Sequence, residues 1–286
     1  MDLVIGATGL LGSTIAHGLL ARGRDVRILV RPGSDASALT AMGAIAVEGD
    51  LKDAASLDRA CKGIDVVVTT ANSAMRGGED NPDTVERAGN RALIDAAAAA
   101  GVRQFVFVSA LGASEDSPVP FLGGKALTEA HLRDSGIPWT IIAPTAFMEV
   151  WVPMLVGAAI DGGRPVVLVG SGRRHHSIIS IRDVAAFAIS TIENPAATNR
   201  YLALGGPEAL TWNEVAERYA HARGKSAEVL HVAPGEPVPG LAPAVAGLAA
   251  GFDTYDSVVP MDELWQMFAV SPTRLEQAME LVTVAE

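Results

Sequence analysis

The stretch Gly6-Ala7-Thr8-Gly9-Leu10-Leu11-Gly12 decides the fold of this chain. It follows an apolar run that predicts a strand over residues 3–6, and it leads into a pattern that predicts a helix over residues 11–21. A turn that carries a pyrophosphate needs glycine for its tight bend, for close approach of the backbone and for helix–strand packing. Because the first turn of a helix also offers free N–H groups to an anion, the stretch predicts a nucleotide cofactor on a Rossmann-type fold. A tight turn without a ligand is the simpler alternative.

Outward from this turn, strands and helices alternate through the first two-thirds of the chain. Such alternation predicts βαβ units, a parallel sheet and, with right-handed crossovers, a doubly wound α/β fold. We expect strands at residues 3–6, 25–30, 44–48, 66–70, 104–108, 139–143 and 166–169. We expect the intervening helices at residues 11–21, 36–42, 55–61, 84–100 and 125–135.

Beyond residue 153 the alternation is looser. The sequence Thr211-Trp212-Asn213-Glu214 fits a capping box, and residues 231–243 carry four prolines and are expected as a loop. Helices are expected at residues 180–193, 211–223, 262–268 and 272–282. We therefore expect a cofactor-binding Rossmann domain over residues 1–153. Residues 154–286 should form a mixed region that partly completes the sheet and builds a smaller C-terminal substrate lobe.

Composition excludes several classes of protein. The formal net charge of −11 argues against a non-specific partner among nucleic acids or anionic membranes, since both need a basic face. The apolar runs are far shorter than the roughly 20 residues of a membrane span. Residues 2–5 already form a strand, which leaves no room for a leader, so a cytoplasmic protein is expected. Cys61 is the single cysteine and is expected to be packed, and a homo-oligomer remains open.

The end of the second expected strand indicates which nucleotide binds. A protein that prefers NAD(H) usually places Asp or Glu there, about 20 residues beyond the turn, to hold the ribose hydroxyls. Here the run Val30-Arg31-Pro32-Gly33-Ser34 offers Arg31, and Ser34 can donate to the same oxygens. A guanidinium suits a 2′-phosphate, and no acid competes for it. We therefore predict NADP(H) as the cofactor; the alternative is an arginine on a solvated loop.

The remaining cofactor contacts are expected at the carboxyl ends of the strands, where ligands bind in open α/β sheets. Gly49-Asp50-Leu51 follows the third strand and can border the adenine, although Asp50 also suits an ordinary helix cap. The expected contacts are Gly6, Thr8, Gly9, Leu10, Leu11, Gly12, Arg31, Ser34, Asp50, Leu51, Thr70, Ala71, Asn72, Ser109, Lys125, Pro144 and Thr145.

Further motifs make the chain resemble a known family. The motifs are the glycine turn, Arg31, Gly49-Asp50-Leu51, Phe105-Val106-Phe107-Val108-Ser109, Gly124-Lys125-Ala126-Leu127-Thr128-Glu129 and the run from Gly136 to Met148. In this order they are similar to the NmrA-like, atypical short-chain dehydrogenase/reductase family over roughly residues 1–230. The resemblance implies the Rossmann fold and NADP(H). It leaves the role open, because the family includes quinone reductases, triphenylmethane reductase, isoflavone-reductase-like enzymes and redox-sensing regulators that bind NADP without turnover.

The usual general acid of short-chain reductases is missing. In those enzymes a serine, a tyrosine and a lysine act together, and the tyrosine protonates the developing alkoxide. Ser109 and Lys125 are present here, but Phe121 stands four residues before Lys125, and all three tyrosines lie far downstream. Without a proton donor a ketone should react slowly, whereas quinones, conjugated enones and cationic dyes give delocalised, weakly basic products. The sequence therefore predicts a small apolar or aromatic, electron-poor acceptor.

Lys125 is the expected catalytic residue, because the resemblance matches it to the catalytic lysine of isoflavone-reductase-like enzymes. Its alternatives are a contact with the cofactor alone, or a surface lysine in the first turn of a helix. The expected substrate pocket is walled by Phe121, Phe147, Met148 and Trp151, although such apolar stripes are more often core. The pair His175-His176 lacks a completing ligand pattern, so no metal site is expected and a loop or strand role is favoured.

Two functions remain in competition. The first is an NADPH-dependent reductase of quinones or similar conjugated acceptors. The second is a sensor that binds NADP(H) and a partner protein without turnover. The surviving Lys125, the glycine turn and the apolar segment around Phe147 favour the enzyme. An isomerase or epimerase that retains its cofactor is disfavoured by the missing tyrosine.

Overall fold

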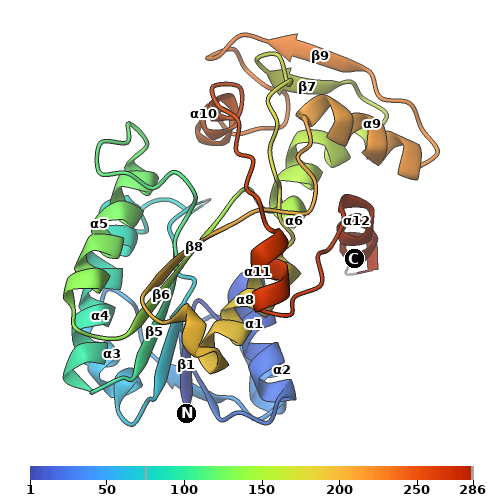
Figure 1. Cartoon of the computed structure of the whole chain (residues 1–286). Coiled ribbons are helices and arrows are strands. Elements are labelled where there is room, and N and C mark those ends of the chain that lie inside the picture. Colours follow the sequence, from blue (N-terminus) through green and yellow to red (C-terminus); the bar gives the residue numbers. More distant parts are fainter. Residues whose placement is uncertain (75, 285–286) are drawn as a thin grey trace. The chain divides into compact units, whose positions relative to one another are not determined.

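The computed structural model describes residues 1–74 and 76–284, which fold into two compact units (Figure 1). The sheet unit, as we call it, comprises Met1–Pro144, Arg182–Ala203 and Gln266–Val270. The second unit comprises Thr145–Ile181, Leu204–Trp265 and Ser271–Glu286. The chain therefore leaves the sheet unit after Pro144 and returns to it twice, first for a helix and a strand and then for the short segment Gln266–Val270.

A seven-stranded sheet forms the centre of the sheet unit, in the order β3-β2-β1-β4-β5-β6-β8. Each pairing from β3 to β6 is parallel; in register, Val4 of β1 faces Ile28 of β2 on one side and Val68 of β4 on the other. This confirms the predicted doubly wound α/β fold. The strands are β1 (Asp2–Ile5), β2 (Val26–Val30), β3 (Ile45–Glu48), β4 (Val66–Thr69), β5 (Gln104–Val108), β6 (Trp139–Pro144) and β8 (Arg200–Leu204).

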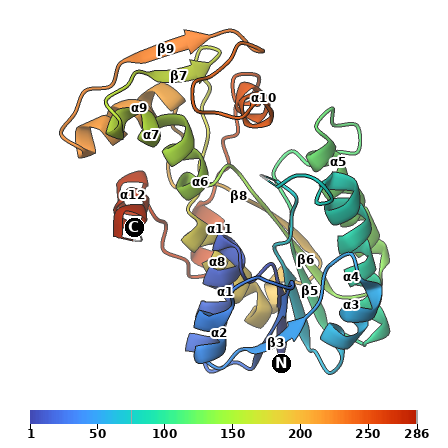
Figure 2. The same ribbon diagram turned by 180° about the vertical axis from the view of Figure 1, so that it is seen from behind.

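Helices cover both faces of this sheet (Figures 1 and 2). On one face lie α1 (Leu10–Ala21), α2 (Ser37–Ala41) and α8 (Ile181–Glu193); on the other lie α3 (Ala54–Cys61), α4 (Asn90–Ala99) and α5 (Pro120–Asp134). Phe105 and Phe107 of β5 are fully buried in a core that includes Leu57 of α3 and Leu132 of α5. Cys61 is packed in the same core, as predicted, and burial raises the pKa of its thiol to about 11.

The helix expected at residues 84–100 differs from the prediction. It begins earlier and consists of a π-helical segment, η1 (Pro82–Gly89), followed by α4. Asn81 caps η1 with its side chain, and Pro82 takes a first-turn position where a missing N–H costs nothing. The periodicity predicted a helix here but not its wider first segment, which buries Glu86; Nδ2 of the buried Asn90 donates to the carbonyl oxygen of Val85 in this segment at 3.1 Å.

The second unit contains the largest departures from the sequence prediction. The strand β7 (Val166–Val169), expected in the main alternation, pairs instead with β9 (Val229–Val232) in a separate two-stranded sheet. Part of the segment expected as a loop is thus the end of β9, and the loop is followed by α10 (Pro243–Gly251). The remaining helices are α6 (Met148–Val152), η2 (Pro153–Gly157), α7 (Ala158–Asp161), α9 (Trp212–Ala222), α11 (Asp262–Met267) and α12 (Leu275–Val284). The capping box at Thr211 and Glu214 is confirmed.

The 3₁₀ segment η3 (Pro195–Ala197) precedes β8.

Across the described ranges, no helix combines the length and apolar character that a membrane crossing requires.

Candidate functional site

The glycine turn between β1 and α1 has one glycine for each physical need. Gly6 has a φ of +82°, and a Cβ on it would lie 2.6 Å from the hydroxyl oxygen of Thr70. A Cβ on Gly12 would overlap the carbonyl oxygen of Gly6. Gly9 has a φ of −91°, and a Cβ on it would meet only the Gly6 oxygen, at 3.4 Å. Gly6 and Gly12 therefore build the turn, while the space over Gly9 stays open.

That open space lies at the N-terminus of α1. Gly9 is the N-cap residue, no side chain caps the helix, and its first turn carries no acid. Thr8, Gly9 and Leu10 are exposed, whereas Leu11 is buried. Backbone N–H groups and the helix dipole thus face an accessible surface, which is the arrangement that binds a phosphate group.

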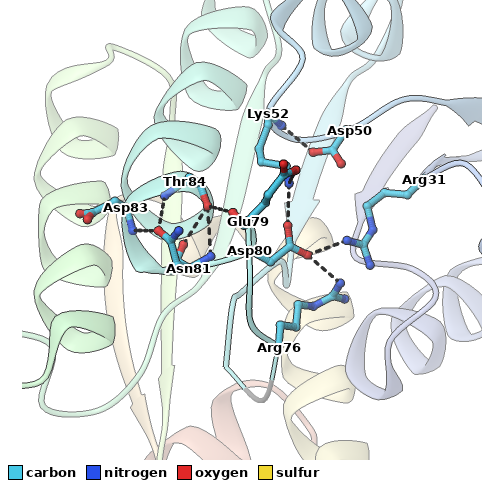
Figure 3. A network of polar contacts seen from close by, with 9 residues as sticks. All are labelled: Arg31, Asp50, Lys52, Arg76, Glu79, Asp80, Asn81, Asp83 and Thr84. Atoms are coloured by element: carbon cyan, nitrogen blue, oxygen red, sulfur yellow. Dashed lines mark hydrogen bonds and ion pairs between the residues drawn. The ribbon is translucent and has the colours of Figure 1, made fainter.

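Arg31, at the end of β2, belongs to a cluster of three cations around one carboxylate (Figure 3). Its Nη1 lies 2.7 Å from Oδ2 of Asp80, Nζ of Lys52 lies 2.8 Å from Oδ1, and Nη1 of Arg76 lies 3.2 Å from Oδ2. The hydrogen bond from Lys52 is the main reason that the pKa of Asp80 lies below its ordinary value. The expectation that no acid competes for Arg31 is therefore wrong, because Asp80 reaches it from a distant loop.

Lys52 and Arg76 are missing from the residues predicted for this spot, as is Asp80. A sequence signal for Lys52 existed, since it directly follows the quoted Gly49-Asp50-Leu51. No comparable signal marked Arg76 and Asp80. Ser34 lies beside the cluster in the chain, and its backbone N–H donates to the carbonyl oxygen of Arg31 at 3.0 Å.

The predicted residues at the sheet edge mostly secure the loops. The hydroxyl of Thr70 is buried and donates to the carbonyl oxygen of Ile5 at 3.3 Å. Asn72 donates through Nδ2 to the carbonyl oxygen of Thr70 at 3.1 Å, and Asp50 accepts from the Lys52 backbone N–H at 2.8 Å. Leu51 is buried in the core. Their expected contacts with a cofactor stay predictions, as does the contact of Ala71, which is partly exposed.

Lys125 is buried within α5, which rules out the alternative of a surface lysine in a first helical turn. The helix begins at Pro120, five residues before the expected start, because proline suits the first helical position. The Lys125 side chain is 2% exposed, and Nζ donates to the carbonyl oxygen of Val108 at 2.9 Å. Nζ also lies 4.8 Å from the ring centroid of Phe107 and 5.5 Å from that of Phe121.

Burial lowers the pKa of Lys125 to about 8, and the carboxylates of Glu86 and Glu129 oppose this shift. Glu86 is fully buried: Oε1 accepts from the backbone N–H of Ser73 at 2.7 Å, while Oε2 has no hydrogen-bond partner among the described residues. Ser109 donates to Oε1 of Glu129 at 2.5 Å. The site thus holds a weakly basic amine and an unsatisfied buried carboxylate oxygen.

Comparison with known proteins agrees with this geometry. A profile described as NAD(P)H-binding matches residues 6–195, well over half of the chain. The chain belongs to this NAD(P)H-binding family.

Its curated relatives include an NAD(P)H azoreductase from Xenophilus azovorans, 32% identical over 79% of this chain and 74% of that protein. A (4-alkanoyl-5-oxo-2,5-dihydrofuran-3-yl)methyl phosphate reductase from Streptomyces griseus is 34% identical, with the same two coverages. The photosystem II assembly factor Ycf39 from Trieres chinensis is 30% identical over 79% of this chain and 70% of that protein.

Solved structures share the fold over nearly the whole chain. Triphenylmethane reductase from Citrobacter sp. in complex with NADP(H) has a TM-score of 0.83 at 20% identity, covering 99% of this chain and 100% of that one. A quinone oxidoreductase from Escherichia coli in complex with NADPH has a TM-score of 0.81 at 24% identity, covering 100% of this chain and 99% of that one.

The residues predicted to wall a substrate pocket are divided between the units of this NAD(P)H-binding protein. Phe121 belongs to the sheet unit, and Phe147, Met148 and Trp151 belong to the second unit. Met148 is buried in the core of the second unit, and the Trp151 ring contacts that of Phe252 edge-on, with centroids 4.8 Å apart. Both thus have core roles, while Phe147 is partly exposed. Their pocket role stays a prediction.

The other predicted residues are secondary to this site. Pro144 ends β6, and Thr145 begins the second unit, where its hydroxyl donates to the carbonyl oxygen of Ser177. The ring nitrogens of His176 pair with the Ser257 hydroxyl at 2.8 Å and the Phe252 carbonyl oxygen at 2.9 Å. The structural role expected for His176 is confirmed.

Proposed function

We propose that this protein is an NADPH-dependent reductase that transfers a hydride to a conjugated, electron-poor acceptor such as a quinone, an enone or a dye. The family binds NAD(P)H, and two relatives are named as reductases, one of azo compounds and one of a (4-alkanoyl-5-oxo-2,5-dihydrofuran-3-yl)methyl phosphate. The observation that carries the choice of acceptor is the pair Phe121 and Lys125. A phenyl ring, not a phenol, stands next to the buried amine.

The residues of the sheet unit fit the cofactor at two separate points. The open space over Gly9 and the uncapped N-terminus of α1 suit the pyrophosphate. Arg31, with Lys52 and Arg76 beside it, suits a 2′-phosphate better than free ribose hydroxyls, which favours NADPH over NADH. When bound, NADPH supplies the hydride. Two further polar groups then remain. Ser109 directly follows the carboxyl end of β5, and Lys125 reaches from α5 to the carbonyl oxygen of Val108 in β5.

The surroundings of Lys125 define which acceptor can react. Reduction of a simple ketone produces an alkoxide that needs a proton donor. General acid catalysis by such a donor typically contributes about 10²–10⁴-fold to the rate. Phe121 offers no proton, and the hydroxyl of Tyr219 donates a hydrogen bond to Oδ2 of Asp161 in the second unit, at 2.6 Å. An acceptor that delocalises the incoming electron pair avoids this need. Lys125, partly protonated near its pKa of about 8, would stabilise the negative charge through Nζ.

A regulator that binds NADP(H) without turnover is the second candidate. One relative is named as an assembly factor, not as an enzyme. In addition, Ser109 and Lys125 are both engaged inside the protein, by Glu129 and by the carbonyl oxygen of Val108. Hydrogen bonds to Glu129 and to the Val108 carbonyl oxygen can stabilise the fold without any role of Ser109 or Lys125 in catalysis.

The test is oxidation of NADPH and NADH with quinones, enones, azo dyes and cationic dyes, with simple ketones as the comparison. We expect turnover with at least one conjugated class, faster with NADPH, and none with the ketones. Lys125→Met keeps the length of the side chain without its charge and should lower kcat/KM at least about 100-fold. Tight NADPH binding without turnover of any acceptor would contradict the reductase and favour the regulator.

A further inference from the structure

We propose that Asp80 is a built-in counter-ion of the 2′-phosphate site, which holds Arg31, Lys52 and Arg76 together until NADP(H) binds and which limits the preference for NADPH over NADH. This inference rests on the proposed function, because it takes the Arg31 cluster as the place of the 2′-phosphate. It concerns a residue that contributes no attraction to a phosphate and is nevertheless at the centre of the site.

The cluster has the composition of a phosphate site whose anion is supplied by the protein. Three cations from three separate loops, those after β2, β3 and β4, converge on the two oxygens of one carboxylate within 3.2 Å (Figure 3). One carboxylate leaves two positive charges uncompensated among these four groups, in a chain whose formal net charge is −11. A phosphate carries up to about two negative charges and three acceptor oxygens, so it would satisfy three cations more fully.

The exposure of these side chains allows such an exchange. The Asp80 side chain is 15% exposed, whereas those of Arg31 and Arg76 are about 40% exposed. The neighbouring acid Glu79 is 96% exposed and reaches only Lys52, at 4.0 Å. The cations are therefore accessible from solvent, and Asp80 is the one acid that contacts all three of them among the described residues.

The backbone beside Asp80 is fixed, so the carboxylate is held close to the cations. Asn81 accepts hydrogen bonds from the backbone N–H groups of Asp83 and Thr84 at 3.0 and 3.1 Å. The Thr84 hydroxyl donates to the carbonyl oxygen of Glu79 at 2.6 Å, on the other side of Asp80 (Figure 3). This cap of η1 anchors the chain on both sides. Rotation of the Asp80 side chain can then release the cations without unfolding the helix.

The consequence is a difference between the two cofactors. NADPH must take the cations from Asp80, so part of its binding free energy is used to break existing ion pairs. NADH lacks the 2′-phosphate and leaves these pairs in place. Removal of the Asp80 charge should therefore strengthen NADPH binding and leave NADH binding nearly unchanged.

The experiment compares the Kd values of NADPH and NADH, measured by calorimetry, for the native chain and for Asp80→Asn. We expect Asp80→Asn to bind NADPH about three- to ten-fold more tightly, the change that corresponds to one partly exposed ion pair. The Kd of NADH should change less than about two-fold. Adenosine 2′-monophosphate serves as a probe of the phosphate alone and should follow NADPH.

Glu79→Gln is the matched control. It also removes one negative charge, but from the neighbouring residue Glu79, which barely contacts the cluster. It should move the Kd of NADPH far less than Asp80→Asn does. Asp80→Ser provides a second variant in case the amide forms new hydrogen bonds, and thermal unfolding verifies that each variant is folded. Weaker NADPH binding in both Asp80 variants would overturn the proposal and make Asp80 a positioning residue for Arg31. An equal gain for NADPH and NADH would also overturn it.

Arg31→Ala separates this inference from the proposed cofactor. If Arg31→Ala abolishes the preference for NADPH, the phosphate site is sound and the Asp80 variants decide the inference on their own. If Arg31→Ala leaves the preference intact, the phosphate lies elsewhere, and both the site assignment and the role of Asp80 fall together.

Discussion

At the scale of single residues, the surroundings of Arg31 and Lys125 determine what each side chain can do. Asp80 lies 2.7 Å from the Arg31 guanidinium, and burial lowers the pKa of Lys125 to about 8. Arg31 and Lys125 could both be selected from motif and position. Their environments could not, because Asp80 lies 49 residues from Arg31 and the groups around Lys125, such as Phe107 and Glu86, come from other elements of the fold. Lys125, expected at the start of a helix, is buried in the middle of one, and Arg31, expected without a competing acid, is paired with Asp80.

Burial of Lys125 predicts a pH-dependent stability. Its pKa falls from an ordinary 10.5 to about 8 on folding, so the unfolded chain binds more protons between these pH values. The penalty for burying the charged amine is complete below pH 8 and disappears as the pH rises towards 10.5. The unfolding free energy of Lys125→Met minus that of the native protein should therefore decrease by up to about 3 kcal/mol from pH 7 to pH 10.

Denaturant unfolding at a series of pH values provides this measurement. The exposed Lys62 supplies the control, because Lys62→Met should keep a constant difference from the native protein. A constant difference for Lys125→Met as well would show that the amine is not charged and buried at neutral pH.

At the scale of elements, the glycine turn was the most predictable part of the molecule. A tight strand–turn–helix passage leaves few residue types at Gly6 and Gly12, so spacing alone identifies it. By contrast, β8 and β9 could not be predicted, because short strands such as Arg200–Leu204 depend on partners far away in the sequence. The position of β7 outside the main sheet could not be predicted either, because it depends on pairing with β9, which is distant in the sequence.

The turn predicts different outcomes for two similar substitutions. Gly9→Ala should fold with nearly native stability, because the backbone there is extended and the added Cβ would contact only the Gly6 oxygen. The same Cβ should weaken NADPH binding about ten-fold or more, because it fills the approach to the pyrophosphate. Gly12→Ala should reduce stability by about 1–3 kcal/mol, because its Cβ overlaps the Gly6 carbonyl oxygen. Thermal unfolding and calorimetric titration of both variants test the pair. Equal losses of stability would contradict the division of roles.

At the scale of the whole molecule, an acidic chain contains a local basic site. The net charge of −11 repels an anionic cofactor at long range, while Arg31, Lys52 and Arg76 form the local positive charge that we propose for its phosphate. Composition argued against a non-specific partner among nucleic acids or anionic membranes, and the fold class could be predicted from the alternation of strands and helices. The convergence of the loops after β2, β3 and β4 could not be predicted, because it depends on the order of these strands in the sheet.

Salt should therefore affect the two cofactors differently. The charges that we propose for the 2′-phosphate contact are partly exposed and are screened within about 10 Å at 0.1 M salt. We expect the Kd of NADPH to rise more steeply with salt than that of NADH, and Arg31→Ala to remove the difference. Parallel salt dependences in the native protein would indicate that the 2′-phosphate contacts no cation.

Hydride transfer from NADPH to an electron-poor carbon can be followed with an isotopic label. NADPH carrying deuterium at the reactive carbon of its nicotinamide should be incubated with a conjugated enone, whose product retains the label on carbon. We predict deuterium in the reduced enone when one labelled face is used and not when the other is, with a lower yield from Lys125→Met. An unlabelled enone recovered unchanged beside tightly bound NADPH would contradict the claim and leave a protein that binds the cofactor without turning it over.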